Sequence, residues 1–541
     1  MPVAPQPAGR SWYETAPMRA HSYQDLKASG ATSGARPVVL GAVAGAAVVA
    51  ATVVPLDRPG LGWPLATLVA TAALVTAARA KSTPAATAAP AAPADATATA
   101  PAPAESGGDA AGVARPDATG APGRAARLAW TAATIALVSV GYVRAAGWLF
   151  ALCLLAAVVT GALAVVGART PLGMLAAVAL TPAAPFRALP WAVRGARRVG
   201  PAASTLRRAL ATGAASVGLL LVFGLLLASA DAVFADLLTG ALPEVGVGGA
   251  VGWLFRVALV GGGLLGAAYL VIAPADLDRL RVAPARSVRR LEWAVPLALL
   301  DALFAAFVLV QLAVLFGGSA HVLRTAGLSY AQYARGGFWQ LLAVSALTLL
   351  VIAGAARWAP RTTRADRVLV RVLLGTLTAL SLVVVASALY RMQVYADAYG
   401  ATRLRLVVAA VELWLGALFV LVGVAVLLLR AGRLPVLVVG TAVLALLGLA
   451  AVNPDRLIAE RNVDRHRQTG RIDVSYLSGL SADAVPALTR LPEPLRSCAL
   501  RDLAGTLPAD GAWTANLGRA TARDLLAAGP IGAPAVDCGN R

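Results

Sequence analysis

The feature that most constrains this chain is a series of apolar runs, each about 20 residues long, that recurs along most of its 541 residues. A helix of about 20 apolar residues crosses the ~30 Å hydrocarbon core of a bilayer, where every backbone polar group has to be satisfied within the protein. Apolar residues make up 58% of the sequence and charged residues only 14%. The sequence therefore predicts an all-α fold, a polytopic transmembrane helix bundle with a small helical C-terminal soluble segment.

The number of spans is predicted to be about eleven, within a range of ten to twelve. The apolar stretch from Pro171 to Pro185 also contains Pro182, and it is expected to be re-entrant or interfacial because proline disfavours helix interiors. The predicted spans lie at about 38–55, 61–78, 128–143, 146–167, 213–237, 250–273, 293–316, 337–356, 368–389, 406–429 and 435–452.

Orientation is predicted from the basic residues, because short cytoplasmic loops are enriched in Lys and Arg. With the N-terminus inside, the inner segments hold 27 basic residues and the outer loops hold 7. The protein is therefore predicted to lie in the cell (inner) membrane with a cytoplasmic N-terminus and, after eleven crossings, an extracytoplasmic C-terminus. A miscount of one span would reverse the placement of the C-terminus.

The spans divide the chain into a membrane part and a soluble tail. The stretch between the second and third spans is rich in Ala, Pro and Thr and has no apolar period, so it is expected to be disordered. The predicted segments are a cytoplasmic N-terminal segment (1–37), a transmembrane hairpin (38–79), this disordered linker (80–127), a transmembrane helical core (128–452) and a soluble helical tail (453–541).

The tail has a helical pattern of its own, with Leu495, Leu500 and Leu503 at near-helical spacing. It is expected to form a small helical cap. Cys498 and Cys538 would face an oxidising compartment if the tail is extracytoplasmic, so a disulfide between them is one expectation and two free thiols the other.

Several enzyme classes are excluded by residues that the chain lacks. Neither of its two lysines follows the glycine turn of a phosphate-binding loop. The three histidines are far apart and the cysteines form no C-x-x-C pair, so no metal site and no cofactor are predicted. Gly261, Gly263 and Gly266 match G-x-G-x-x-G, but they lie inside an apolar run with no preceding strand. Close helix packing is expected there instead, through Gly262 and Gly266 and likewise Gly41 and Gly45. The charge of +20 lies between apolar runs, which indicates the lipid bilayer rather than nucleic acid as partner.

Few ionisable residues stand inside the spans, and those few are costly to insert. Arg256 and Glu412 are expected at the same depth below the outer surface, so the sequence predicts an ion pair between them. The alternative makes Glu412 or Asp301 a proton or ion relay.

Two outer loops bring tyrosines and arginines together. Clustered guanidinium groups beside phenols suit a phosphate or carboxylate head group, whereas single tyrosines at this depth are also ordinary residues of the interfacial belt. The candidate anion-binding residues are Tyr330, Tyr333, Arg335, Arg391, Tyr395, Tyr399 and Arg403.

The same loops carry a resemblance to a known family. The amino-acid sequence of these loops, together with two motifs in the tail, is similar to a bacterial multi-pass membrane family known as domain of unknown function 4153/4173. The resemblance covers roughly residues 210 to 500. The resemblance implies a polytopic inner-membrane protein with a C-terminal polar segment, and it implies no activity or substrate. The resembling motifs are Tyr330 to Gln340, Tyr390-Arg391 with Tyr395, Tyr399-Gly400 and Arg403, Asn453-Pro454-Asp455 with Asn462, and Asp473 to Leu488.

All four motifs fall on the outer side of the predicted topology, which indicates a shared outer surface or, alternatively, a tail that only packs on the loops as a cap. The favoured function is binding, with transport as an extension, of an anionic envelope component or lipid head group at this face. A second hypothesis is a membrane-embedded enzyme that uses Glu412, Asp455 or Asp483 on a lipid-linked substrate. A third is a scaffold or sensor whose tail recruits a protein partner.

Overall fold

A computed structural model describes residues 34–82, 121–197, 247–274, 289–316 and 338–529, with a few isolated positions between 212 and 280. Within these ranges the chain forms helices and no strand, which confirms the all-α fold. Ten helical segments are long and apolar enough to cross a membrane, so the protein is a multi-pass membrane protein. The predicted span at 213–237 lies almost wholly outside the described residues, and the count of eleven stays a prediction.

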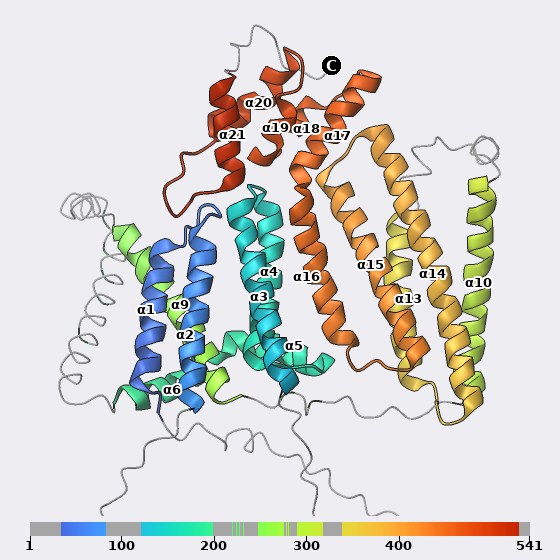
Figure 1. Cartoon of the computed structure of the whole chain (residues 1–541), viewed down its shortest axis with the longest axis horizontal. Coiled ribbons are helices and arrows are strands. Elements are labelled where there is room, and N and C mark those ends of the chain that lie inside the picture. Colours follow the sequence, from blue (N-terminus) through green and yellow to red (C-terminus); the bar gives the residue numbers. More distant parts are fainter. Residues whose placement is uncertain are drawn as a thin grey trace, which may run out of the picture.

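The long helices form two groups joined by α16 (Leu434–Val452), which contacts α3 and α4 on one side and α15 on the other (Figure 1). The first group consists of α1 (Pro37–Val53), α2 (Gly62–Ser82), α3 (Ala121–Val143), α4 (Gly147–Val166) and α9 (Val247–Ile272). The second group consists of α10 (Arg290–Phe316), α13 (Phe338–Trp358), α14 (Arg364–Tyr399) and α15 (Arg403–Leu428).

The two groups are packed differently. Interior positions of the first group, such as Ala46, Ala73 and Ala77, are small, which lets helix backbones approach closely. A Cβ on Gly266 of α9 would lie 2.7 Å from the backbone of Pro185, so this glycine serves the expected helix contact. The second group is filled by larger side chains, among them Trp293, Phe304, Leu374, Leu377 and Phe419.

The segment Pro171–Ala196 is apolar enough and long enough to cross a membrane when taken as one piece. It consists of three pieces, α5 (Pro171–Leu180), a 3-10 turn η2 (Thr181–Ala183) and α6 (Ala184–Ala196). Figure 1 shows these pieces running across the lower end of the bundle, under the first group. There they contact α4 and α9 rather than running beside them from end to end.

Helix ends correct the predicted boundaries of the linker. α2 continues to Ser82 and α3 begins at Ala121, so residues 121–127 belong to a helix. Residues 83–120 lie outside the described part of the chain. α14 is 36 residues long and continues past the predicted end of its span at residue 389.

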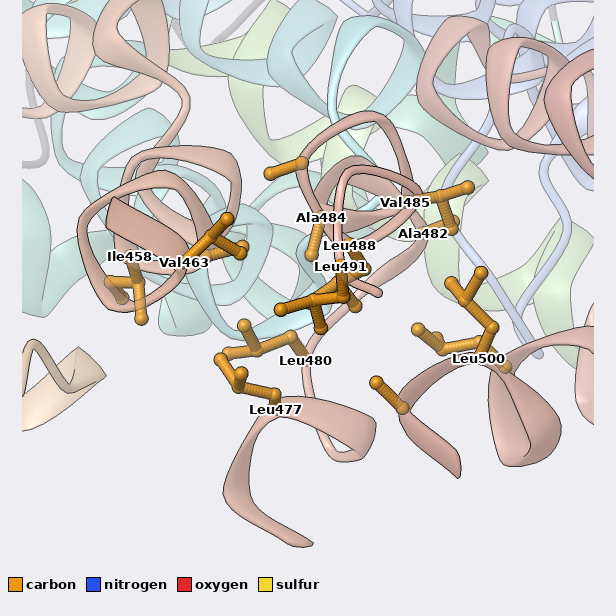
Figure 2. Close-up of a cluster of buried hydrophobic side chains, with 14 of the residues drawn as sticks. Ile458, Val463, Leu477, Leu480, Ala482, Ala484, Val485, Leu488, Leu491 and Leu500 are labelled. Carbon is orange, nitrogen blue, oxygen red and sulfur yellow. The ribbon is translucent and has the colours of Figure 1, made fainter. Parts of the chain in front are cut away.

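The tail forms a helical cap, as its leucine spacing indicates. Its core is filled by aliphatic side chains from every helix of the tail, including Ala522 of α21. Ile458, Leu477, Leu488 and Leu500 are almost fully buried (Figure 2). We call residues 454–529 the cap. It comprises α17 (Pro454–Thr469), α18 (Val474–Ser478), the 3-10 turn η4 (Ala482–Ala484), α19 (Val485–Leu488), α20 (Leu495–Thr506) and α21 (Leu517–Ala528).

Candidate functional site

The cap lies on one end of the bundle, which is at the top of Figure 1 and is called the upper end. Three loops of the bundle contact the cap there, at residues 54–61, 144–146 and 400–402. The N–H of Leu61 donates to the carbonyl of Ala515 at 3.0 Å. Segments far apart in the sequence therefore meet at one junction between cap and bundle.

The centre of the junction is the carboxylate of Asp455, in the first turn of α17 and 0% exposed. Its oxygens accept hydrogen bonds from both Nε and Nη2 of Arg403, at 2.9 and 2.6 Å. Trp148 Nε1 at 3.2 Å and the N–H of Ser481 at 2.9 Å complete the set. Four donors from three distant segments thus satisfy one buried charge. The contact of Arg403 is bidentate, which fixes the orientation of the two side chains and strengthens the pair.

A second buried carboxylate, that of Asp483, lies beside the start of α4. Its Oδ2 accepts from the N–H groups of Ala145 at 2.7 Å and Ala146 at 3.2 Å. An acidic group is favourable at this position, because the first N–H groups of a helix lack partners within the helix. The hydroxyl of Ser481 donates to the same oxygen at 3.4 Å, so Ser481 contacts both buried carboxylates.

The loop between α14 and α15 is held by two further cap residues. The phenol oxygen of Tyr476 accepts from the N–H of Arg403 at 2.7 Å, and Asn462 Nδ2 donates to the carbonyl of Ala401 at 2.8 Å. Gly400 has a φ of +85°, and a Cβ there would collide with Asn462 Oδ1. This explains physically why a glycine follows Tyr399.

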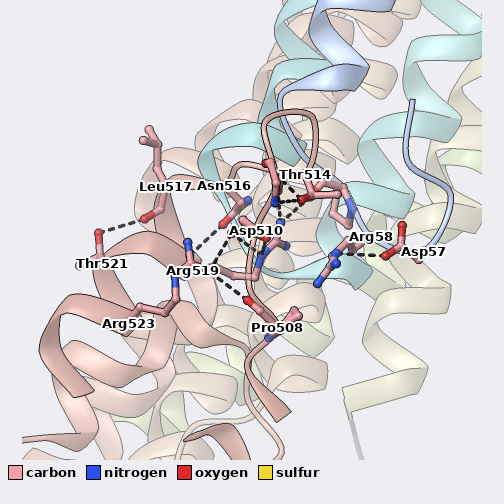
Figure 3. Close-up of polar contacts among 12 residues, drawn as sticks. Asp57, Arg58, Pro508, Asp510, Thr514, Asn516, Leu517, Arg519, Thr521 and Arg523 are labelled. Carbon is pink, nitrogen blue, oxygen red and sulfur yellow. Dashed lines mark hydrogen bonds and ion pairs between the residues drawn. The ribbon is translucent and has the colours of Figure 1, made fainter. Parts of the chain in front are cut away.

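Figure 3 shows the contacts of α21 with the first hairpin. Asn516 caps α21 and also donates from Nδ2 to the carbonyls of Gly141 and Arg144, both at 2.9 Å. Arg519 is paired with Asp510 at 2.9 Å and donates to the carbonyl of Pro59 at 3.0 Å. The far end of the cap is therefore also attached to the bundle.

Arginines at the helix ends satisfy carbonyl groups that helices leave unpaired at their C-termini. Arg144 donates to the last carbonyls of α16, at Ala450 (2.7 Å) and Ala451 (3.0 Å), and Arg465 donates to those of α14, at Asp397 and Ala398. Guanidinium has five donors in a fixed fork, which suits this task. The same use occurs at other helix ends, for Arg127 with α4, Arg256 with α1, Arg361 with α13 and Arg371 with α15.

The candidate anion-binding residues have different environments. Arg403 is neutralised by Asp455, and Arg391 Nη2 donates to Gln311 Oε1. Arg405 lies over the ring of Tyr395, 4.3 Å from its centroid, and the rings of Tyr395 and Tyr399 are 5.0 Å apart. The remaining candidates, Tyr330, Tyr333 and Arg335, lie outside the described residues.

The predicted ion pair between Arg256 and Glu412 is not formed. Arg256 donates to the carbonyls of Gly252 and Val54, and neither oxygen of Glu412 has a hydrogen-bond partner. The prediction compared only the depth of the two residues below the membrane surface, which says nothing about their lateral positions. α9 belongs to the first group and α15 to the second, so the two side chains are separated laterally (Figure 1).

The cysteines differ in state. Cys498 of α20 is disulfide-bonded, whereas Cys153 of α4 is a buried free thiol. Cys538 lies outside the described residues, so its pairing with Cys498 stays a prediction. No cluster of three or more His, Cys, Asp or Glu side chains suited to a metal ion occurs in the described part of the chain.

The two junction carboxyl groups titrate in opposite directions. Burial alone would raise the pKa of Asp455, but the hydrogen bonds and charge of Arg403 outweigh it, and the pKa lies below its ordinary value. Burial raises the pKa of Asp483 above its ordinary value, because the N–H of Ala145 and the charge of Arg144 offset it only in part. Asp455 therefore stabilises the junction above pH ~3.9 and loses this effect as pH falls through its folded-state pKa.

For Asp483 the sign is reversed. Its contribution is fully present below about pH 3.9, the ordinary pKa of the group, and is lost as pH rises through the higher folded-state pKa. We expect the thermal midpoint of Asp483→Asn, minus that of the wild type, to grow as pH rises from 4 to 7. The matched control is Asp502→Asn, because Asp502 is exposed on the same cap. A difference that stays constant across this pH range would contradict the assignment.

Comparison with protein families matches this chain to the family described as Domain of unknown function (DUF4153), over residues 132–491. The match covers about two-thirds of the chain. It begins in α3, well before residue 210, and so includes Trp148 as well as the resembling motifs of the loops and cap. No curated protein and no solved structure matches the chain.

Proposed function

This chain belongs to the DUF4153 family, and from that premise we propose that it is a non-enzymatic protein of the cell membrane that holds a rigid helical cap on the extracytoplasmic side. The cap serves as a platform that binds an envelope component. The observation that carries the proposal is the carboxylate of Asp455, whose four donors come from α4, α15 and the cap. A cap on a flexible tether would need no such buried charge pair.

The same contacts argue against the junction as a catalytic site. A general base needs a lone pair that is free to take a proton from substrate. The oxygens of Asp455 are occupied by Arg403, Trp148 and Ser481, and Asp483 accepts from backbone N–H groups. Both carboxylates serve to position loops.

Two observations support the extracytoplasmic side for the cap. Within the bundle, leaving the cap aside, basic residues are concentrated at the lower end, where Arg187, Arg194, Arg290 and Arg367 lie, as expected for a cytoplasmic face. Cys498 is disulfide-bonded, and disulfides persist in oxidising compartments.

The disulfide gives a direct test of side. We expect non-reducing mass spectrometry of protein from intact cells to detect one peptide pair that joins Cys498 to Cys538. A membrane-impermeant maleimide should label Cys498 in the Cys538→Ser variant without lysis. Labelling that requires lysis would place the cap in the cytoplasm, and free thiols at both positions in the wild type would contradict the pairing.

A second candidate function is binding of an anionic head group near the upper ends of α14 and α15. The stack of Arg405, Tyr395 and Tyr399 favours it, because it places aromatic rings and guanidinium groups together at the membrane surface. Binding of vesicles with and without anionic lipid to Arg335→Gln and Arg391→Gln variants tests this. Unchanged preference for anionic vesicles in both variants would exclude it.

The platform is tested by photo-crosslinking from exposed cap positions in cells, with probes at Arg467 and Trp513. We expect both probes to capture one and the same envelope component, and we expect capture to fall when Arg403→Ala loosens the cap. Arg456→Ala is the matched control, since Arg456 pairs only with Glu460 of its own helix at the surface. Capture that is insensitive to Arg403→Ala would overturn the role of the fixed cap.

A further inference from the structure

Buried polar side chains in the membrane part are concentrated in the second group of helices. Within the described parts of α1 to α9, the buried polar residue is Thr160. The second group, by contrast, buries Asp301 of α10, Ser345 and Thr348 of α13, Thr378 and Ser381 of α14, and Glu412 of α15. Ionisable residues are costly in a membrane and are candidate functional groups, whereas serines and threonines also serve helix packing.

Glu412 and Ser345 form the upper part of this set. Each is 1% exposed, and within the described residues neither the carboxyl oxygens of Glu412 nor the hydroxyl of Ser345 has a hydrogen-bond partner. A buried polar group without a partner costs about 1–3 kcal/mol. Two such groups on neighbouring helices are therefore candidates for binding a proton or a polar ligand.

Helix register places Glu412 and Ser345 at the same level. Leu342 of α13 and Val408 of α15 pack in one cluster with Met392 of α14. α13 and α15 both run away from the upper end, so Ser345 and Glu412 each follow one turn, about 5.4 Å, deeper. Both lie on the buried stripe of their helix and so face the interior of the group.

Asp301 forms the lower part of the set. It is buried, and its two oxygens also have no hydrogen-bond partner in the part of the chain that the structure describes. α10 and α14 run in the same direction, since Arg290 is paired with Asp366 near their starts and Gln311 accepts from Arg391 near their ends. The first pair places Asp301 level with residue 377 of α14 and the second pair with residue 381.

The distance between the two carboxyl groups follows from α14. Gly416 lies against Val385, which places Glu412 level with about residue 389. Asp301 is therefore about 8–12 residues, or roughly 12–18 Å, deeper. The hydroxyl of Thr348 lies within this interval, and those of Ser381 and Thr378 lie at its lower end. Each donates to a carbonyl one turn back, and its lone pairs can still accept a proton.

Few charged groups face these carboxyls. α16 has no charged residue, and the described part of α13 has none before Arg357 at its lower end. On α14 the charged residue nearest to Glu412 is Arg391, which donates to Gln311, and the one nearest to Asp301 is Arg371, which donates to the carbonyl of Leu427. On α10 the only acidic residue above Glu292 is Asp301 itself. A lone negative charge in such surroundings is costly, so each carboxyl group is expected to carry a proton in its resting state.

We propose that α10, α13, α14 and α15 form a proton path across the membrane, in which Glu412 and Asp301 are the proton-binding groups and the hydroxyls between them relay the proton. Each carboxylate accepts a proton from one side and releases the same proton to the other, so nothing else is consumed. The inference goes beyond the platform function and does not depend on it.

The test uses the full chain in liposomes that contain a pH-sensitive dye, with a potassium gradient and valinomycin to set the potential. We expect wild-type vesicles to take up protons faster than protein-free vesicles, and Glu412→Gln and Asp301→Asn each to reduce the rate at least tenfold. Ser345→Ala should slow it less. Glu460→Gln in the cap is the matched control, with no expected change.

A second readout follows the carboxyl groups themselves. We expect the infrared absorption of a protonated carboxyl group in the wild type at neutral pH, and its partial loss in each carboxyl variant. Wild-type vesicles that take up no more protons than protein-free ones at either polarity would overturn the path. An unchanged rate in a folded Glu412→Gln variant, or ionised carboxyls at neutral pH, would overturn the role of these residues. None of these results affects the cap.

Discussion

Arg403→Ala is expected to release the cap from the bundle more than any other single change at the junction. It leaves the carboxylate of Asp455 buried without its counter-charge, and breaking a buried ion pair in this way costs about 3–5 kcal/mol. The side chain of Arg403 is 34% exposed, so water can partly replace the guanidinium and the lower end of that range applies. At about 3 kcal/mol, the open population rises roughly 100-fold.

Proteolysis of the native protein measures this population, because cleavage follows the opened state when opening and closing are fast. We expect proteinase K to cut the cap of Arg403→Ala about 100 times faster than that of the wild type. Arg456→Ala removes an exposed ion pair within α17, worth about 0.3–0.5 kcal/mol, and should change the rate less than about threefold. Adding Asp455→Asn to Arg403→Ala should recover part of the loss, since it removes the buried charge. Equal rates for the two arginine variants would refute the role of the Arg403–Asp455 pair in holding the cap on the bundle.

The helices of the bundle could be predicted from the sequence because their length is set by the bilayer. The apolar runs correspond to α2, α4, α15 and α16 within a few residues at each end. Boundaries failed where polar residues continue a helix beyond its apolar run. α14 keeps its hydrogen bonds through Tyr399 at the upper end, and α3 begins at Ala121, before its apolar run.

The candidate site was predictable in place and only partly in role. The sequence indicated that Arg403, Asp455 and Asp483 share one face, and the structure brings them together at the junction. Arg403 was expected to bind an anion from outside, whereas its anion is the carboxylate of Asp455. A sequence pattern shows that arginines gather, but it does not show which acidic group 52 residues away will fold against them.

The contributions of Trp148 and Arg144 were missed altogether. Arg144 caps α16, which lies more than 300 residues further along the chain. Its partners are backbone carbonyls, which every residue has, so the residue types at those positions give no hint of the contact. The same limit applies to Arg256, which was assigned to Glu412 but donates to the carbonyl of Val54. One signal in the sequence was not used. An arginine in a loop can cap the C-terminus of a neighbouring helix, and in this chain nearly every basic residue is an arginine.

Glu412→Leu is expected to make the protein more stable, which is the reverse of the usual result for a buried position. The carboxyl group of Glu412 is buried with no hydrogen-bond partner, so the native state carries a cost of about 1–3 kcal/mol that an aliphatic side chain of similar volume would remove. Residues kept at such a cost are typical of functional sites, where stability is given up for activity.

The thermal midpoint of the variant in detergent, compared with the wild type, measures this effect. We expect a rise for Glu412→Leu and no rise for Ser381→Ala, because the hydroxyl of Ser381 already donates to the carbonyl of Leu377 at 2.7 Å and its loss removes a satisfied bond. If Glu412→Leu lowers the midpoint, then the carboxyl group has a stabilising partner, such as a water held with Ser345, and its role is structural. A higher midpoint together with lost proton uptake would instead show that Glu412 lowers the stability of the protein and is needed for proton transfer.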